Sequence, residues 1–426
     1  MDRYALAVLL EPIRKELGLS DREIGVLTGI AFAIAFSVAA IPIGRIADRV
    51  SRRTIVAIAI TFWSICTAAV AAGTSFAHLV AARIGVAIGE AGGYSPVHSL
   101  LADMYPKERR AGALGIVLTF GMLGVTVGFA LAGIVADAYG WRAAFLSMGF
   151  AGAALGPVAL LALLEPPRGL SDGISVDTRP ISTTEAFSEL FSRRSFVFVV
   201  IGFCISGLAA YGTTVWVPTY FARRFTLSTT QVGAIASLYL AVPTTIGTLA
   251  GGIICNRLAN RDVRWSVWFP GLCLIACGPI QTLQLLAPTA NLAAAATVMP
   301  SLVGGAFAPP LLASLQTLSG ARLRATGTAV GAFAALLVGQ GGGPTLIGIL
   351  SQFLSGSWQM GPMRSLQTAL LCALTLYVVG GLLVLLAGRY FIQDIANLRA
   401  FDEGRAPATK RDKWGLPGRK SQRQPQ

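Results

Sequence analysis

The chain has 426 residues, of which 54% are hydrophobic and only 13% are charged, with a formal net charge of +14. Apolar runs of about 20 residues, each long enough to cross a bilayer core of roughly 30 Å, recur along almost its whole length, which excludes a soluble globular protein. The basic residues lie in short loops and in the C-terminal tail, a distribution that the positive-inside rule explains and that excludes a nucleic-acid-binding surface. So many crossings require helices, and we predict an all-α integral membrane protein.

The first segment, residues 1–17, is too short to cross a membrane. Asp2 and Arg3 precede an apolar stretch that ends at Glu11, which leaves about ten residues, roughly 15 Å of helix. This length would place Asp2 and Arg3 near the middle of the bilayer, where charges are costly. The segment has no basic leader and no cleavage site of a signal peptide. We therefore expect the first transmembrane helix to be truncated at its N-terminal side.

Five more crossings complete a first half, residues 1–164. Apolar runs predict helices near 20–46, 54–74, 76–101 and 113–136, and a sixth that follows Gly140 and ends near 164. Ser20 and Glu23 have the spacing of a capping box at the start of the second helix. Glycines recur in the fourth and fifth runs, which favours close contacts between helices.

A polar interruption at residues 165–194 separates this half from a second one, residues 195–388. Within it, Phe187, Leu190 and Phe191 form an apolar stripe at helical spacing, which predicts a short amphipathic helix on the membrane surface. Six further runs follow, near 195–221, 229–255, 265–287, 291–318, 325–354 and 366–387. Residues 389–426 form a basic, polar tail.

Loop charge predicts the orientation. One set of loops carries most of the bases, namely Arg45, Arg49, Arg52, Arg53, Lys107, Arg109, Arg110, Arg193, Arg194, Arg257, Arg261, Arg264, Arg322, Arg324 and those of the tail. The loops of the other set hold few bases. The first set is therefore expected in the cytoplasm, together with the linker and both termini, in a multi-pass protein of the plasma (inner) membrane.

Two charged residues lie inside the fourth apolar run. Arg83 and Glu90 are about two helical turns apart, so both point to the same side of one helix. The pair could be a structural ion pair, or the acid could be a proton or substrate site, since ionisable groups inside membranes are usually functional. Pro96, Leu101, Arg110 and Ala111 recur as Pro310, Leu315, Arg324 and Ala325 at one constant spacing. This repeat makes Gly304 the counterpart of Glu90 in the second half, where Asp262 is the only acid before the tail. Because the fold does not require this carboxylate, we favour a functional role.

The loop Gly44-Arg-Ile-Ala-Asp48-Arg49-Val-Ser-Arg52-Arg53 resembles the signature loop of the major facilitator superfamily, with Ser51 where glycine is usual. Residues 79–89, with Arg83, resemble its fourth-helix motif. The segments Asp2-Arg-Tyr-Ala-Leu6, Gly89-Glu-Ala-Gly-Gly93 and His98-Ser-Leu-Leu-Ala-Asp103 resemble the spinster-like family, which includes sphingolipid and lysophospholipid transporters. This resemblance implies a major facilitator fold of two six-helix halves that alternate access to a central site.

The resemblance also implies roles for residues. Glu90 and Asp2 would form a protonatable pair, and Arg3 would be their counter-ion or would bind an anionic headgroup; Arg83 would be either a structural partner or a site residue. A cytoplasmic gate would comprise Gly44, Arg45, Asp48, Arg49, Arg52, Arg53 and Asp103. In this gate Asp48 would cap a neighbouring helix and Asp103 would pair with Arg45 or Arg49. A loop that merely orients the protein would explain the arginines but not Asp48.

Tyr211, Trp216, Tyr239 and Gln340 are candidates for lining the cavity, although aromatic residues near helix ends are often interface anchors instead. We expect a proton-coupled transporter of an amphipathic or lipid-like molecule, acting as a monomer without metal or cofactor. Efflux or uptake of a small organic acid or drug is the alternative, and a membrane sensor that does not transport is a second one. No nucleotide-binding GxxxxGK[ST] motif is present and no catalytic set assembles, so neither ATP-driven transport nor an enzyme is expected.

Overall fold

The computed structural model describes residues 2–47, 49–105, 107–166 and 183–402. Within these ranges the side chains of some helical residues, including Asp2, Arg3 and His98, are outside the description, as is Asp48 altogether. The described part is helical throughout, with short connections and no strand. Nine helical stretches of it are long and apolar enough to cross a membrane. The predicted all-α membrane fold is confirmed.

The first half begins with a capping box. Ser20 accepts a hydrogen bond from the backbone N–H of Glu23 at 3.2 Å, and the Glu23 carboxylate accepts one from the Ser20 N–H at 2.8 Å, as the sequence predicts. The predicted second helix is interrupted at Gly29, and the single helix over the fifth and sixth runs bends at Gly140, where φ is 84°. The helices are α1 (Asp2–Leu17), α2 (Asp21–Thr28), α3 (Ile30–Ala47), α4 (Arg52–Val70), α5 (Phe76–Met104) and α6 (Lys107–Ala162).

The second half contains two π-helical segments, η1 (Ala236–Ala241) and η2 (Ala334–Gly342), inside membrane-crossing helices. The last helix extends to Asp402, so the residues after 388, which we predicted to be a tail, begin as a continuation of that helix. The α-helices are α7 (Thr183–Phe191), α8 (Arg194–Phe225), α9 (Thr229–Ile235), α10 (Val242–Ala259), α11 (Trp265–Leu286), α12 (Ala290–Phe333), α13 (Gly343–Ser357) and α14 (Pro362–Asp402).

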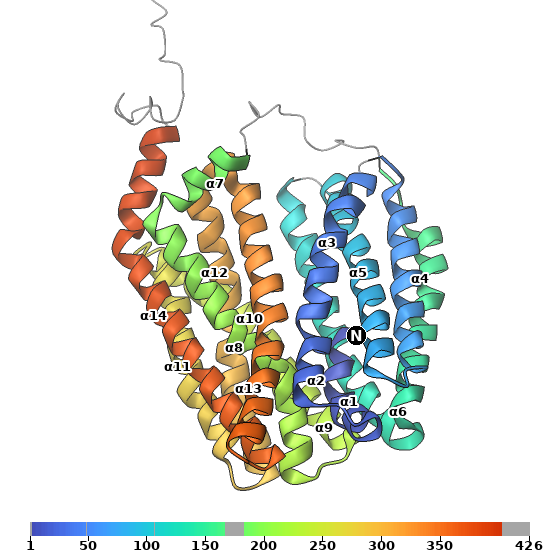
Figure 1. Cartoon of the computed structure of the whole chain (residues 1–426). Coiled ribbons are helices and arrows are strands. Elements are labelled where there is room, and N and C mark those ends of the chain that lie inside the picture. The colour runs from blue at the N-terminus through green and yellow to red at the C-terminus, as the bar shows by residue number, and fades with distance from the viewer. Residues whose placement is uncertain (1, 48, 106, 167–182, 403–426) are drawn as a thin grey trace, which may run out of the picture.

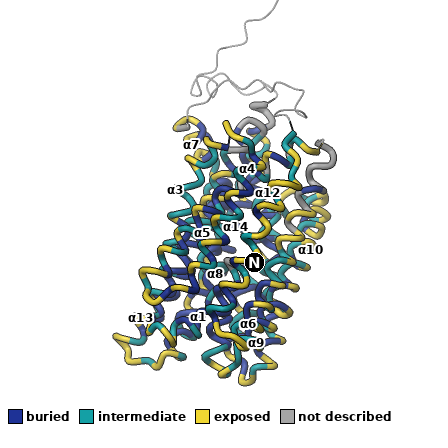
Figure 2. Tube along the Cα trace, turned by 90° about the vertical axis from the view of Figure 1, so that its right-hand side faces the viewer, coloured by how far each residue is buried: buried dark blue, intermediate teal, exposed yellow. Residues whose placement is uncertain are grey.

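Figure 1 shows the helices as two bundles standing side by side, α1–α6 on the right and α8–α14 on the left. We call the end at which α7 lies and α14 finishes the linker face, and the other end the opposite face. Figure 2 shows that exposed and buried segments alternate along the helices over the whole length of the molecule. This pattern is expected where each helix turns one side to the bundle and the other to lipid.

Glycines in α5 allow α4 to come close, as the sequence predicts. A methyl group on Gly89 would lie 2.7 Å from the Cβ of Trp63, and one on Gly85 would lie 2.5 Å from the sulfur of Cys66. Real Cβ atoms do not approach so closely, so a larger residue at either position would push the helices apart. The small residues around Glu90 therefore serve helix packing on the α4 side.

Helix α7 is the predicted amphipathic helix of the linker. Leu190 is fully buried against the second half, whereas Phe187 and Phe191 are each 43% exposed and stack on each other at 6.0 Å between ring centroids. The predicted apolar stripe is thus divided: Leu190 anchors the helix to the protein, whereas Phe187 and Phe191 stay partly exposed. Phe191 also packs edge-on against the buried Phe196 of α8, with 5.7 Å between ring centroids.

Candidate functional site

A cavity of about 1160 Å³ of empty volume lies between the two bundles. Its wall comes mainly from the second half, with α1 and α6 contributing from the first. None of the described residues that line it is charged; they are Tyr4, Met122, Val125, Phe129, Phe203, Gly207, Ala210, Tyr211, Thr213, Thr214, Leu240, Ala241, Thr244, Gln281, Pro300, Ser301, Gly304, Phe307, Ala308 and Tyr377. This cavity offers a large apolar surface with a few hydroxyl and amide groups, which suits an organic molecule.

A smaller cavity of about 430 Å³ adjoins it and contains a charge. Both cavities share Tyr4, Tyr211 and Thr214, whereas the smaller one is also lined by Arg83 and Gln340. The Arg83 side chain is only 3% exposed, and its guanidinium carbon lies 5.0 Å from the centroid of the Phe32 ring. Among the described residues, the lining of the combined space is therefore cationic at Arg83 and uncharged elsewhere.

Glu90 and Arg83 both lie in α5, as predicted. Glu90 is half-buried and lines neither of these cavities, whereas its repeat counterpart Gly304 lines the larger one. The side chains of Asp2 and Arg3, the predicted partners of Glu90, lie outside the described residues. Their role in a cluster with Glu90 stays a prediction.

The four candidates for cavity lining divide into two pairs. Tyr211 and Gln340 line the cavities, as expected. Trp216 does not: its side chain is fully buried, and its indole N–H donates to the Pro344 carbonyl at 2.9 Å, so it fastens α8 to α13. Tyr239 lies in η1, is 38% exposed and lines neither cavity.

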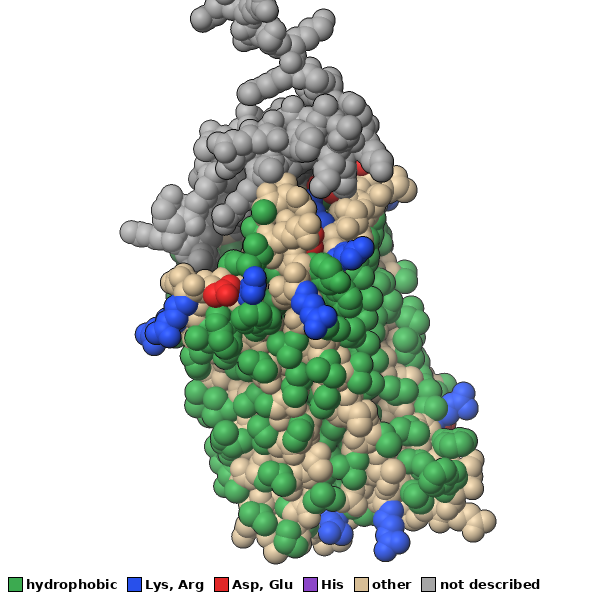
Figure 3. Space-filling model, turned by 90° about the vertical axis from the view of Figure 1, so that its left-hand side faces the viewer, with side chains coloured by type: hydrophobic (Ala, Val, Ile, Leu, Met, Phe, Trp, Pro, Cys, Tyr) green, Lys and Arg blue, Asp and Glu red, His purple; other side chains and the backbone are tan. Residues whose placement is uncertain are grey.

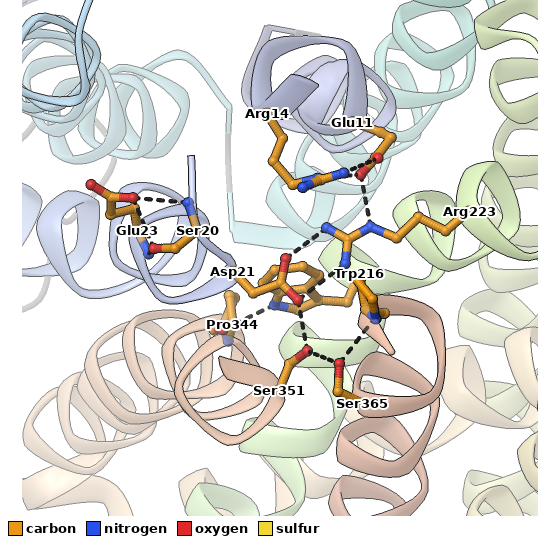
Figure 4. A network of polar contacts seen from close by, with 11 residues as sticks. Glu11, Arg14, Ser20, Asp21, Glu23, Trp216, Arg223, Pro344, Ser351 and Ser365 are labelled. Atoms are coloured by element: carbon orange, nitrogen blue, oxygen red, sulfur yellow. Dashed lines mark hydrogen bonds and ion pairs between the residues drawn. The ribbon is translucent and has the colours of Figure 1, made fainter. Parts of the chain in front are cut away.

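A buried ionic network joins the two halves near the opposite face (Figure 4). Arg223, at the end of α8, donates two hydrogen bonds to Asp21 at 2.6 and 3.0 Å and one to Glu11 at 2.7 Å. Ser351 of α13 donates to Asp21 at 2.6 Å, and Arg14 holds Glu11 from within the first half. The side chains of Arg223 and Glu11 are each only 5% exposed. Such a pair is strongly directional, because a planar guanidinium matches a carboxylate at two points.

Beside this network, Thr345 occupies the interruption between α2 and α3. Its hydroxyl accepts from the Ile30 N–H at 3.1 Å and lies 3.0 and 2.7 Å from the carbonyl oxygens of Gly25 and Gly341. The backbones are very close here, since a methyl group on Gly29 would lie 2.5 Å from the Gly341 carbonyl oxygen. Thr345 thus satisfies backbone groups that the break at Gly29 leaves without a helical partner.

A third set of contacts joins α6 to α9 and η1. Asp137 accepts from the Thr229 hydroxyl at 2.8 Å, and Ser237 donates to the Thr126 carbonyl at 2.9 Å. Within the described residues, all hydrogen bonds between the halves lie between the middle of the helices and the opposite face. The described structure is therefore sealed toward the opposite face by polar contacts.

Two of the predicted gate residues, Arg52 and Asp103, form a cluster on the linker face with Glu165, the first residue of the linker. Arg52 is buried and pairs with both Asp103 and Glu165, the latter at 3.0 Å. Glu165 also accepts from the Ser51 hydroxyl and the Arg53 N–H, at 2.9 and 2.8 Å. Burial alone would raise the pKa of Glu165, yet these donors and the Arg52 guanidinium lower it to about 2. The cluster ties the start of α4 to the ends of α5 and α6.

The structure changes the expected pairing in this gate. The partner that the structure shows for Asp103 is Arg52, whereas Arg45 and Arg49, which we expected to pair with it, are exposed. Gly44 lies with Arg45 in the last turn of α3, and Arg53 is exposed next to the buried Arg52. The capping role predicted for Asp48 lies outside the described residues.

Sequence reasoning missed four residues of these contacts: Glu11, Asp21, Arg223 and Glu165. Asp21, Arg223 and Glu165 stand at or next to a helix end, where a charged residue normally signals only the end of a membrane crossing. Glu11 lies inside α1, where the sequence shows only that the apolar stretch stops. One signal in the sequence could have indicated this network. Arg223 lies in a half whose only acid is Asp262, so a carboxylate partner for it is expected from the first half. Among the described residues, no group of three or more His, Cys, Asp and Glu side chains could hold a metal ion.

Two helical bundles around a central cavity, sealed by polar contacts on one side, define a secondary transporter. Residues 1–344 match the Major Facilitator Superfamily, and the chain belongs to this family of transporters. An MFS-type efflux pump of Mycolicibacterium smegmatis is 30% identical over 396 residues, which cover 93% of this chain and 90% of the relative. The sphingosine-1-phosphate transporter SPNS2 of Danio rerio is 26% identical over 432 residues, covering 92% and 82%.

A solved structure supports the spinster-like resemblance. It is a bacterial homologue of the human lysosomal transporter Spinster, in an inward-facing and unoccupied conformation. It superposes with a TM-score of 0.83 at 25% identity and covers 92% of this chain and 94% of its own. These proteins are transporters rather than enzymes, as the sequence indicates.

Proposed function

We propose that the protein is a proton-coupled secondary transporter of an amphipathic, lipid-like organic molecule. The observation that carries this proposal is the division of the central space: Arg83 lines its smaller part, whereas the described residues that line the larger part are all uncharged. A substrate with an anionic head and an apolar tail would place the head toward Arg83 and α5. Its tail would contact residues such as Phe203 and Phe307 in the second half.

Alternating access would proceed by rocking of residues 1–164 against residues 195–388 around this cavity. With the polar contacts on the opposite face, the described conformation corresponds to one open toward the linker face. The positive-inside rule makes the linker face cytoplasmic, with both termini on that side of the inner membrane. We expect the working unit to be a monomer, since the two halves that line the cavity belong to the same chain.

Glu90 would carry the coupling proton, with Asp2 as the second protonatable group and Arg3 as their counter-ion. Burial raises the pKa of a carboxyl group and a nearby arginine lowers it, so a change in hydration during the cycle can drive proton uptake and release. Arg83 lines the smaller cavity from the same helix, where it would contact the substrate head. The cycle would thereby couple protonation of Glu90 to movement of an anionic substrate.

Flux into proteoliposomes, with and without a pH gradient, tests the function. Lysophospholipids and sphingosine phosphates represent the proposed class, and small organic acids and drugs represent the alternative that the mycobacterial efflux pump favours. Glu90→Gln should abolish the stimulation by the gradient, while Glu16→Gln, which alters an acid paired with Arg142 far from the cavity, should retain it. Flux of Glu90→Gln that still follows the gradient would refute the coupling, and binding without flux would identify a sensor instead.

A further inference from the structure

Three exposed arginines lie at the linker face of the second half. Arg194 is the first residue of α8, Arg264 precedes the first residue of α11, and Arg389 follows the long apolar run of α14. They therefore stand at the same depth, where their helices leave the apolar region. Figure 3, which shows the side of the molecule formed by this half, has Lys and Arg side chains at that end above a broad hydrophobic surface.

Two of these arginines rest on aromatic rings. The guanidinium carbon of Arg264 lies 5.6 Å from the centroid of Trp268, and that of Arg194 lies 5.4 Å from the centroid of Tyr390. Phe198 stacks on Tyr390 with 5.9 Å between centroids, which fixes the ring. A guanidinium that packs on an aromatic ring uses no N–H group in that contact, so its N–H groups can still bind an anion.

Helix α14 brings the three positions together. Trp268 of α11 packs directly on Gly388, and Tyr390 lies under Arg194 of α8. Arg389 follows Gly388 and precedes Tyr390 in the sequence, and it is about 100° around the helix from each of them. Its side chain therefore projects between the α11 and α8 contacts. The three cations form a continuous strip across α11, α14 and α8, which we call the arginine strip.

The acids near the arginine strip are engaged elsewhere. Asp262 accepts a hydrogen bond from the backbone N–H of Arg264 at 2.9 Å. Asp394 accepts hydrogen bonds from the backbone N–H of Ser195 at 2.9 Å and from the Ser195 hydroxyl. The Asp394 carboxylate thereby caps the start of α8. No ion pair between described residues includes an arginine of the strip. Its charge is therefore available to a partner outside the chain.

Exposed apolar residues continue from the strip toward the middle of the helices. Ile201 of α8, Leu272 of α11 and Leu382 of α14 are 43%, 48% and 50% exposed, respectively, and each lies about two turns from an arginine of the strip. A ligand that fits both features has an anionic head that arginine binds at two points and apolar chains that follow the helices. A free phosphate ion would use only the first feature.

We propose that the arginine strip binds the phosphate headgroup of an anionic phospholipid, with the acyl chains along α8, α11 and α14. Arginine forks match phosphate oxygens, and Trp and Tyr are typical of the depth at which headgroups lie. The site is on the lipid-facing side of one half and is separate from the central cavity. It is independent of the substrate and of proton coupling.

The test is retention of phospholipid by the purified full chain after extraction from vesicles of phosphatidylcholine, with or without phosphatidylglycerol, read by native mass spectrometry. The wild type should retain phosphatidylglycerol in preference to phosphatidylcholine. Each basic residue near an anionic membrane surface contributes about 1 kcal/mol, so Arg194→Gln/Arg264→Gln/Arg389→Gln should weaken retention by roughly a hundredfold. Lys15→Gln/Arg22→Gln/Arg364→Gln, which removes the same charge from exposed positions of the opposite face, should retain it.

Arg389→Gln alone should give an intermediate loss, and Arg264→Lys should lose part of the retention although the charge is kept. Three results would overturn the proposal: equal loss in both triple variants, no preference of the wild type for phosphatidylglycerol, or displacement of the lipid by inorganic phosphate alone. The first would identify a general effect of net charge, and the last would identify an anion site without a role for acyl chains.

Discussion

Arg223→Gln should shift the balance between the two conformations of the transporter. Arg223 gives three charge-assisted hydrogen bonds to Asp21 and Glu11, at 2.6, 3.0 and 2.7 Å, and all three cross between the halves. When the opposite face opens, these groups separate and water solvates them. The substitution therefore removes stabilisation from the described conformation and little from the alternative one.

The size of the shift follows from the burial of the network. Removing one member of a buried ion pair costs about 3–5 kcal/mol. Glu11 keeps Arg14 and Asp21 keeps Ser351, so we expect the lower end, about 3 kcal/mol. This corresponds to roughly a hundredfold change in the conformational equilibrium.

Pulsed electron spin resonance measures the change directly. Spin labels at Lys15→Cys and Arg364→Cys, exposed on the opposite face of the two halves, would be placed in a chain whose native cysteines are replaced by alanine. Arg223→Gln should move the distance distribution to longer values. Glu16→Gln, which disrupts an ion pair with Arg142 inside the first half, should leave it unchanged. A folded Arg223→Gln protein with the distribution of the parent would show that the network does not hold the face closed.

Two further predictions concern the other polar contacts. Thr345→Val should destabilise the closed opposite face by about 1–2 kcal/mol, because the Ile30 N–H loses its acceptor; Thr345→Ser should restore the parent distance distribution of the same labels. Glu165→Gln should lower the melting temperature in detergent most at neutral pH. The carboxylate of Glu165, with a pKa of about 2 against 4.5, stabilises the fold above pH 4.5, and this contribution declines as the pH falls toward 2.

A different result would contradict each of the predictions for Thr345 and Glu165. Equal distance distributions for Thr345→Val and Thr345→Ser would mean that the hydroxyl is not needed at the break in the second helix. For Glu165, the full pKa difference corresponds to about 3 kcal/mol, and partial exposure of the side chain reduces the expected effect to about 1–2 kcal/mol. A difference between wild type and Glu165→Gln that persists unchanged at pH 3.5 would contradict the assigned charge.

Features that depend on neighbours in the sequence could be predicted. The capping box of Ser20 and Glu23 needs only residues three apart, and the turn at Gly140 follows from a glycine between two apolar runs. The position of Arg83 and Glu90 on one helix follows from helical periodicity alone. Membrane crossings are similarly local, because the bilayer fixes their length and composition.

Features that depend on which helices meet could not be predicted from the sequence. Arg223 and Asp21 are distant in the sequence, and no pattern around either residue distinguishes a buried partner from an arginine that anchors a helix end. Arg45, Arg49, Arg52 and Arg53 are equivalent in type and spacing, and only the approach of α5 and the end of α6 selects Arg52 for burial. Trp216 failed as a cavity residue for the same reason, since packing against α13 rather than its composition decides its orientation.

The two charged clusters have different parts in an alternating cycle. The cluster around Arg52 joins the first half only to Glu165, the residue that directly follows it, so the cluster can stay intact while the halves move. The network around Arg223 joins the halves and must break whenever the opposite face opens. Opening therefore requires compensation from the hydration of the separated charges, from new contacts at the linker face or from contacts with the substrate. A substrate that bridges Arg83 in the first half and the apolar wall of the second is suited to provide it, because both sides of the cavity would then close on one molecule.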